Sequence, residues 1–140
     1  MKAVPPNKIA HIGIAVHSIE KSLPFYTEHL GLELEKLENV MSEQVKVAFI
    51  KIGETRLELL EPLKKSSVIY EFLQKKGEGI HHIALEVDDL TSRLYKLRNE
   101  GIHVINEEPK KGANNSLIAF LHPRSTSGVL IELCEHNKKG

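Results

Sequence analysis

The sequence predicts an α+β fold made of two copies of one βαβββ unit. The first reason is an internal repeat: the stretch "IAHIGIAV" at residues 9–16 matches "IHHIALEV" at 80–87 at four of eight positions, with an offset of 71 residues. The second reason is that each stretch is followed by an amphipathic segment ending in glycine and then by three runs of strand length. The repeat therefore predicts equivalent elements in both halves of the chain.

The first copy begins with a strand at residues 9–16, which is rich in isoleucine. A helix follows, with Ser18 as its N-cap and an apolar face made of Ile19, Leu23, Tyr26 and Leu30. Pro24 lies inside this helix and is expected to loosen or kink it, and Gly31 is expected to end it in a left-handed cap. The remaining strands of this copy are expected at 32–37, 44–52 and 55–61.

The second copy repeats this order. Its first strand is expected at 80–87, and its helix begins after Asp88 or Asp89, ends at Gly101 and has an apolar face made of Leu90, Leu94 and Leu97. Three strands follow at 102–105, 116–121 and 128–134. Between the copies we expect a short helix from Val68 to Lys75, opened by Ser66 or Ser67. We predict a single domain over residues 1–140, with modules at 9–62 and 80–135 and a linker at 63–79.

The composition restricts the class of protein. A chain of 140 residues can bury a core of its own, and its net charge of zero and pI of about 7.1 leave no basic stripe for nucleic acid or an anionic membrane. Cys134 is the single cysteine, which excludes an intramolecular disulfide, and it is expected to be a small buried residue on a strand. The start "MKAVPPNK" has no apolar core and no run of about 18 apolar residues follows, so we expect neither a signal peptide nor a membrane span. We therefore expect a cytoplasmic protein that binds a small molecule.

Alternation along the strands separates two histidines from the core. In the strand at 9–16, His11 points to the side opposite Ile12 and Ile14, beside the small residues Gly13 and Ala15. His82 occupies the equivalent position in the second copy. His81 has the parity of the core side, and we expect it to hydrogen-bond near the strand edge.

Each copy also places a glutamate inside an apolar strand. Glu58 in "LEL" and Glu132 in "IEL" are flanked by leucine or isoleucine, where an unpaired carboxylate is costly to bury. Glu61 and Glu135 have the opposite parity and are expected to face solvent. If the two modules enclose one cavity, two imidazoles and two carboxylates would suit a divalent ion such as Co, Mn, Ni or Zn. The residues concerned are His11, Glu58, His82 and Glu132.

Six longer stretches carry a resemblance to a known family. They are "HIGIAV" (11–16), "FYTEHLGLE" (25–33), "RLELLEP" (56–62), "GEGIHHIALEV" (77–87), "EEPKKGA" (107–113) and "IAFLHPRSTSGVLIEL" (118–133). In these stretches the chain resembles the methylmalonyl-CoA epimerases of the vicinal oxygen chelate (glyoxalase/bleomycin resistance/dioxygenase) superfamily. The resemblance implies a glyoxalase-like fold, a cupped eight-stranded mixed sheet around one metal ion. Its implied ligands are His11, Glu58, His82 and Glu132.

The resemblance also implies an isomerase that interconverts (2R)- and (2S)-methylmalonyl-CoA by 1,1-proton transfer through a metal-stabilised enolate. A carbon acid beside a thioester needs such stabilisation before a carboxylate can deprotonate it. Glu132 is expected to be one base. The second is left open among Glu58, Glu43, Lys46 and a metal-bound water, because the strand "VKVAF" at 45–49 lacks the glutamate that some family members carry there.

The implied partner is an acyl-CoA thioester. Basic residues in predicted loops are candidates to meet its phosphates, with backbone N–H groups near Gly112: Lys64, Lys65, Lys110, Lys111 and Arg124. The family commonly pairs chains, so we expect a homodimer. We expect no nucleic-acid or membrane partner.

Three other functions use the same fold. Glyoxalase I (lactoylglutathione lyase) acts on a glutathione hemithioacetal with the same four ligands, and the stretches "GEGIHH" and "FLHPRSTSGVLIEL" favour the epimerase over it. A metal-free drug-binding protein would lack the ligands, whereas this sequence has all four. An iron dioxygenase needs two histidines and one carboxylate with open positions. The additional Glu58 and the short chain argue against that function.

Overall fold

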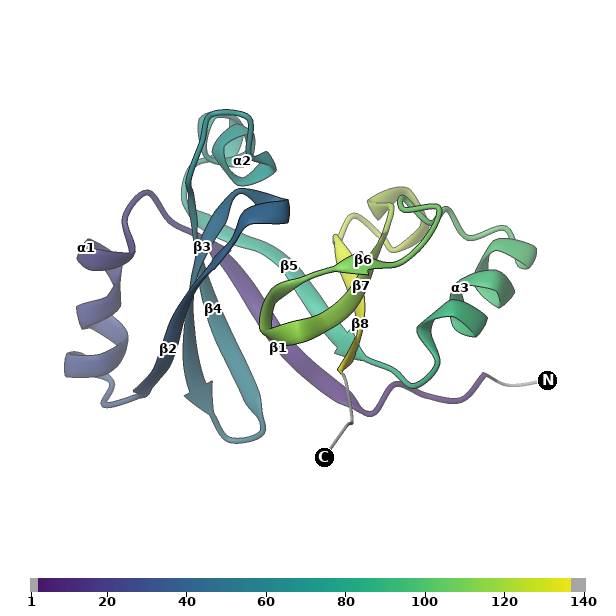
Figure 1. The fold of residues 1–140 in the computed structure, drawn as a ribbon, viewed down its shortest axis with the longest axis horizontal. Helices are drawn as coiled ribbons and strands as arrows, with labels where there is room; N and C mark the ends of the chain where they lie inside the picture. The colour runs from purple at the N-terminus through teal and green to yellow at the C-terminus, as the bar shows by residue number, and fades with distance from the viewer. Residues whose placement is uncertain (1–2, 137–140) are drawn as a thin grey trace. The chain divides into compact units, whose positions relative to one another are not determined.

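The computed structural model describes residues 3–136, whose fold is drawn in Figure 1. Within these residues eight strands are hydrogen-bonded in the order β2-β3-β4-β1-β5-β8-β7-β6, which confirms the predicted α+β fold with a mixed eight-stranded sheet. The strands and α-helices are β1 (Lys8–Ala15), α1 (Ile19–Pro24), β2 (Glu33–Val40), β3 (Val45–Ile52), β4 (Thr55–Pro62), α2 (Val68–Lys76), β5 (Gly79–Glu86), α3 (Leu90–Asn99), β6 (Lys110–Lys111), β7 (Ser116–Leu121) and β8 (Ile131–His136).

The chain divides into two compact units, and the division crosses strands β1 and β5. The first unit is His11–His81. Of the residues that the structure describes, the second unit contains those up to Ala10 and those from His82 onward. In the first unit β1 pairs with β4 in parallel, and β3 pairs with β2 and β4 antiparallel. The second unit repeats the pattern, because β5 and β8 are parallel while β7 is antiparallel to β6 and β8.

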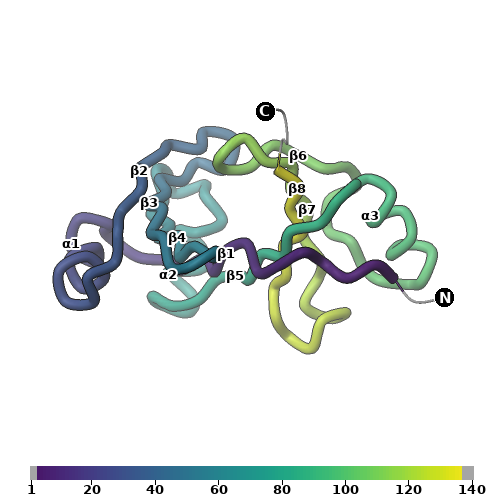
Figure 2. Tube along the Cα trace, turned by 90° about the horizontal axis from the view of Figure 1, so that it is seen from below, coloured from purple at the N-terminus to yellow at the C-terminus, as the bar shows by residue number. Residues whose placement is uncertain are grey.

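Helix α1 covers one side of the first unit's strands, as Figures 1 and 2 show. Its Ile19 is buried with Val16, Ala48, Ile50 and Leu59 in one apolar core. Helix α3 does the same in the second unit, where its apolar face packs in a core with residues of β7 and β8: Val87, Leu90, Leu94, Ala119, Leu121 and Leu133. The predicted core faces of both copies are therefore confirmed, except at Leu30.

The helix boundaries follow the predicted caps. Ser18 accepts a hydrogen bond from the Lys21 N–H, Asp89 accepts one from the Ser92 N–H, and Ser67 opens α2. Helix α1 ends at Pro24, where the proline ring cannot continue the hydrogen-bond pattern, and a five-residue π-helical turn (Phe25–His29) follows. Leu30, expected on the buried face, is exposed because this wider turn shifts it off that face.

The strand predicted at 102–105 is wrong, since only Val104 makes an isolated bridge there, to Leu121. The side chain of Asn106 explains the interruption: its Oδ1 accepts the Phe120 N–H at 2.7 Å, in place of a backbone carbonyl. The last strand begins at Ile131 rather than at 128, because Ser127 and Gly128 turn with φ of 59° and 87°.

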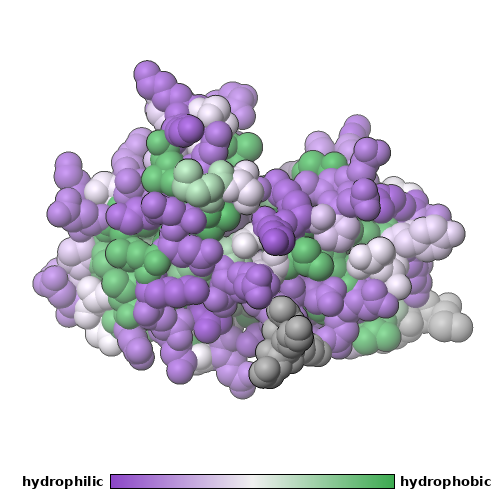
Figure 3. Space-filling view, viewed as in Figure 1, coloured by the Kyte–Doolittle hydropathy of each residue, from purple (hydrophilic) through white to green (hydrophobic). Residues whose placement is uncertain are grey.

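Hydrophilic side chains cover much of the face in Figure 3, and hydrophobic side chains lie between them in separate patches. Among the described residues there is no helix with the length and apolar character that a membrane span requires.

Candidate metal centre

The first unit contains a buried ion pair between His11 on β1 and Glu58 on β4. The Nδ1 atom of His11 lies 3.1 Å from Oε2 of Glu58, and the two residues are 8% and 6% exposed. Strands β1 and β4 are parallel with Gly13 opposite Glu58, so the carboxylate reaches diagonally to His11. The sequence-predicted pair of this copy is thus brought together by two adjacent strands.

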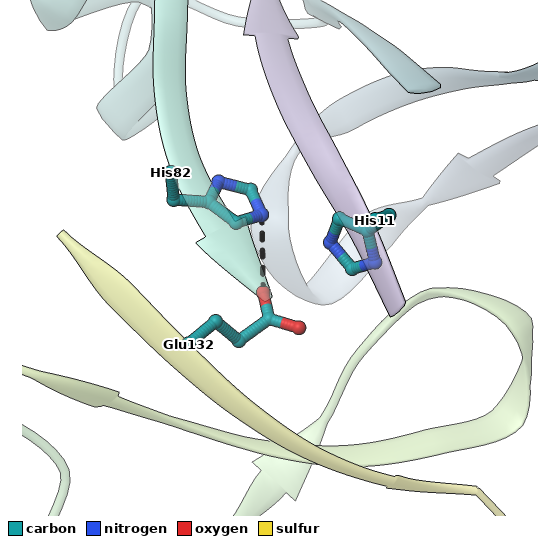
Figure 4. A group of neighbouring side chains, drawn as sticks. All are labelled: His11, His82 and Glu132. Atoms are coloured by element: carbon teal, nitrogen blue, oxygen red, sulfur yellow. Dashed lines mark ion pairs between the residues drawn. The ribbon is translucent and has the colours of Figure 1, made fainter. Parts of the chain in front are cut away.

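The second unit contains the equivalent pair, His82 on β5 and Glu132 on β8, drawn with a dashed line in Figure 4 together with His11. Here Nε2 of His82 lies 3.3 Å from Oε1 of Glu132, and the residues are 6% and 4% exposed. Ala84 is opposite Glu132 on the parallel neighbour, as Gly13 is opposite Glu58.

A phenylalanine stands beside each carboxylate on the antiparallel neighbouring strand. Phe49 is opposite Glu58, and Phe120 is opposite Glu132. The Phe120 ring meets the His82 ring edge-on, with centroids 5.6 Å apart and planes at 88°. A small residue on one side and an aromatic ring on the other therefore hold each carboxylate in an apolar setting.

The buried carboxylates and imidazoles stabilise one another, because an isolated buried carboxylate would cost several kcal/mol. Their donor atoms are also those that divalent transition ions prefer, imidazole nitrogen and carboxylate oxygen. His11, His82 and Glu132 are three buried residues of the types that hold such an ion, and Glu58 adds a further carboxylate of the same kind. The residues present fit a divalent metal by the chemistry of their donors.

Lys46 and Glu43, the other two side chains considered as a second base, do not lie beside Glu58 on its face of the sheet. Lys46 alternates with Val45 and Val47 on β3, so it lies on the opposite face of the strand from Phe49 and Glu58. Glu43 lies in a short 3₁₀ turn before β3. The face that carries Glu58 also carries Lys36, whose Nζ is 5.1 Å from the Phe49 ring centroid and 3.6 Å from Glu38 Oε1.

Glu61 and Glu135 do not behave as the solvent residues that their parity suggests. Oε1 of Glu61 accepts the Ile19 N–H at 2.8 Å, and Oε1 of Glu135 accepts the Leu90 N–H at 2.8 Å. Each carboxylate satisfies the first N–H group of the helix in its own unit and lies at the positive end of the helix dipole. Glu61 and Glu135 each follow the buried glutamate of their copy by three residues, and this equivalence in the repeat could have indicated a shared role.

A third histidine–glutamate pair was missed by sequence reasoning. His136 Nδ1 lies 3.1 Å from Glu86 Oε1, on the same two strands as the His82–Glu132 pair and farther along them. His81, by contrast, meets the Phe72 ring of α2 edge-on at 5.0 Å. The doublet at residues 81–82 therefore divides, with one ring against a helix and the other beside a buried carboxylate.

The basic residues suggested for phosphate contacts lie on exposed segments of the chain. Lys64 and Lys65 precede α2, Lys110 and Lys111 form β6, and Arg124 lies in the 3₁₀ turn Pro123–Ser125.

Residues 10–120 match the Glyoxalase/Bleomycin resistance protein/Dioxygenase superfamily. The chain is 46% identical to the uncharacterized protein YqjC of Bacillus subtilis, over 92% of both chains. It is 39% identical to the human mitochondrial methylmalonyl-CoA epimerase, over 90% of this chain and 72% of that protein. A variant Streptomyces coelicolor methylmalonyl-CoA epimerase, solved in complex with 2-nitronate-propionyl-CoA, superimposes with a TM-score of 0.90 at 36% identity, covering 95% of this chain and 96% of that one.

Proposed function

Because this chain belongs to the Glyoxalase/Bleomycin resistance protein/Dioxygenase superfamily, we propose that it is a metal-dependent epimerase that interconverts (2R)- and (2S)-methylmalonyl-CoA. The observation that carries the proposal is the pair of buried histidine–glutamate contacts, one in each unit. The relation to methylmalonyl-CoA epimerases at 36–39% identity supports the substrate class. The expected homodimer and the cytoplasmic location stay predictions.

The proposed ligands of the metal are His11, His82 and Glu132, with Glu58 as the fourth ligand that the sequence suggests. When bound, a divalent ion would supply a Lewis acid for the negative charge that develops on the thioester oxygen. Glu58 has a second role in the proposal: it accepts a hydrogen bond from His11 Nδ1, so that Nε2 of that ring would be the atom to hold a metal ion.

The proton transfers are assigned to the two carboxylates. Glu132, 4% exposed, takes the proton from C2 on one face of the substrate, because a carboxylate shielded from water is a stronger base toward a bound carbon acid. Glu58, 6% exposed, enters this step as the neutral acid and not as a metal ligand, and it returns its proton on the other face, so that the two carboxyl groups exchange protonation states in each turnover. Glu58 is preferred to Lys46 for this step, since Lys46 lies on the opposite face of its strand.

Exchange of the C2 hydrogen tests the proposal directly. The protein is stripped of metal, divided and restored with Co, Mn, Ni or Zn, and each sample is incubated with methylmalonyl-CoA in heavy water. We expect deuterium at C2 and loss of optical purity in a restored sample, and neither in the stripped one. The stripped protein serves as the control for spontaneous exchange.

Absence of exchange in protein that holds one metal ion per chain would refute the epimerase. The same samples are then given the hemithioacetal of glutathione and methylglyoxal. Turnover of that substrate would assign the site to glyoxalase I chemistry, in which the same ligands stabilise an enediolate.

A further inference from the structure

Two histidines and an arginine form a cluster at the end of β7, which we call the His103–Arg124 cluster (His103, His122 and Arg124). The rings of His103 and His122 are stacked, with centroids 4.8 Å apart and planes at 4°. Nη2 of Arg124 lies 3.0 Å from Nδ1 of His103. His122 follows β7 directly, and its backbone N–H donates to the His103 carbonyl at 2.9 Å. The cluster is therefore held by backbone contacts as well as by its side chains.

The direction of the hydrogen bonds fixes what the cluster offers to a ligand. A guanidinium only donates, so Nδ1 of His103 accepts from Arg124, and Nδ1 of His122 accepts the backbone N–H of Arg124 at 2.9 Å. In each neutral ring the proton then resides on Nε2, which becomes a donor. Arg124 keeps further N–H groups, because only one of its nitrogens contacts His103. The cluster presents donors from three side chains.

The charge of the cluster selects the kind of ligand. Within residues 3–136 no carboxylate lies at ion-pairing distance from the Arg124 guanidinium. A metal ion on the histidines would stand close to this fixed positive charge and be repelled by it. An oxyanion would be attracted, and a guanidinium suits the oxygens of a phosphate group well. The arrangement favours a phosphate over a metal ion.

The cluster lies on the same face of the second unit's strands as the His82–Glu132 pair. Val104 and Leu121, which bridge each other, pack in the core under α3, so the neighbouring pair His103 and His122 points to the opposite side. Phe120, two residues before His122 and about 7 Å along the strand, is on that side too and meets the His82 ring. A ligand that reaches from one group to the other would span one face of the sheet.

We propose that the His103–Arg124 cluster binds a phosphate group of the substrate's coenzyme A half. The phosphate site stands on the cluster itself, whereas its assignment to coenzyme A rests on the proposed function. Arg124 is one of the five basic residues that the sequence offers for phosphate contacts, and in the structure it contacts both histidines of the cluster.

Binding is tested by NMR on the protein with ¹⁵N-labelled histidine, titrated with inorganic phosphate and, separately, with coenzyme A. We expect saturable shifts of the His103 and His122 ring nitrogens with both probes. Arg124→Gln should weaken each binding constant by about tenfold, the value of one charge-assisted hydrogen bond. Arg93→Gln is the matched control, because Arg93 also lies in the second unit and donates to the Val4 carbonyl, away from the cluster. It should bind as the unmodified protein does.

Four outcomes would overturn the proposal. Absence of saturable shifts, or equal binding by the Arg124→Gln variant, removes the phosphate site. Shifts of these rings by Zn²⁺ in place of phosphate would make the cluster a metal site. Phosphate binding that coenzyme A does not displace would assign the cluster to free phosphate and remove the link to the substrate.

Kinetics separate this proposal from the proposed function. With methylmalonyl-CoA, Arg124→Gln should raise KM about tenfold and leave kcat unchanged, while the pantetheine thioester, which lacks the nucleotide, should show no change in KM. An equal KM increase with both substrates would contradict a phosphate contact. Coenzyme A binding at the cluster of the metal-loaded protein without any C2 exchange would refute the epimerase and leave the phosphate site standing, because binding needs no turnover.

Discussion

The histidine–glutamate pair of the first unit and that of the second unit occupy equivalent strands, yet they meet through different ring nitrogens. His11 contacts Glu58 through Nδ1 at 3.1 Å, whereas His82 contacts Glu132 through Nε2 at 3.3 Å. An imidazole whose Nδ1 donates to a carboxylate keeps Nε2 for a metal, which is the usual arrangement around a ligating histidine. The repeat therefore preserves residue types and register. Because the ring nitrogens differ, the two carboxylates can have different roles.

The surroundings of the pairs divide into parts that are repeated and parts that are not. The small residue and the phenylalanine beside each carboxylate are repeated, and so is the glutamate that reaches the first helical N–H group. The edge strands differ: β2 has eight residues and β6 has two. The repeated features are those that position the two pairs.

The largest expected effect is the loss of metal on removing a histidine of either pair. His82→Ala and His11→Ala should each abolish binding of one divalent ion per chain, because a site with one nitrogen ligand fewer holds these ions far less tightly. Metal content is measured after dialysis, and folding is checked by circular dichroism. His82→Asn is a second variant in case the buried Glu132 is left too poorly paired in the alanine variant.

His81→Ala is the control, since it removes the adjacent imidazole, which meets Phe72. It should keep the full metal content. An unchanged stoichiometry in folded His82→Ala or His11→Ala would exclude that residue from the site.

The next largest effect concerns Glu58 and Glu132, which are proposed to transfer protons on opposite faces of the substrate. Glu58→Gln should retain deuterium exchange at C2 from one stereoisomer without inverting it, because Glu132 still removes and returns a proton on its own face. Glu132→Gln should reduce that exchange by about 10³-fold. Each rate is measured at saturating metal with resolved (2R)- and (2S)-methylmalonyl-CoA.

Inversion at an undiminished rate in Glu58→Gln would show that another group returns the proton. Glu43→Gln is the matched control, because it removes a carboxylate that the sequence also offered and that lies in the turn before β3. Both stereoisomers should react normally with that variant.

The two copies also show which features a sequence reveals. The βαβββ order, the core faces and the histidine and glutamate positions follow from repeat register and alternation, which are local properties. The interruption near residue 106 could not be predicted, because it depends on Asn106 reaching the Phe120 N–H fourteen residues away. The stacking of His103 on His122 could not be predicted either. It brings together residues 19 positions apart, beside the single β-bridge between Val104 and Leu121. Contacts made by single side chains across the chain carry no periodic signal.

The smallest expected effect is on stability. It concerns Glu61 and Glu135, whose side chains accept the first N–H group of α1 and of α3. Glu135→Ala should lower the free energy of unfolding by about 1 kcal/mol, because the Leu90 N–H loses its acceptor and the helix end loses a favourable charge. Glu61→Ala should cost less, since α1 has six residues before Pro24 ends it, whereas α3 continues for ten. Urea unfolding measures both, with Glu107→Ala, an exposed carboxylate, as the control. If both variants lose the same free energy of unfolding, α1 depends on its glutamate as much as α3 does.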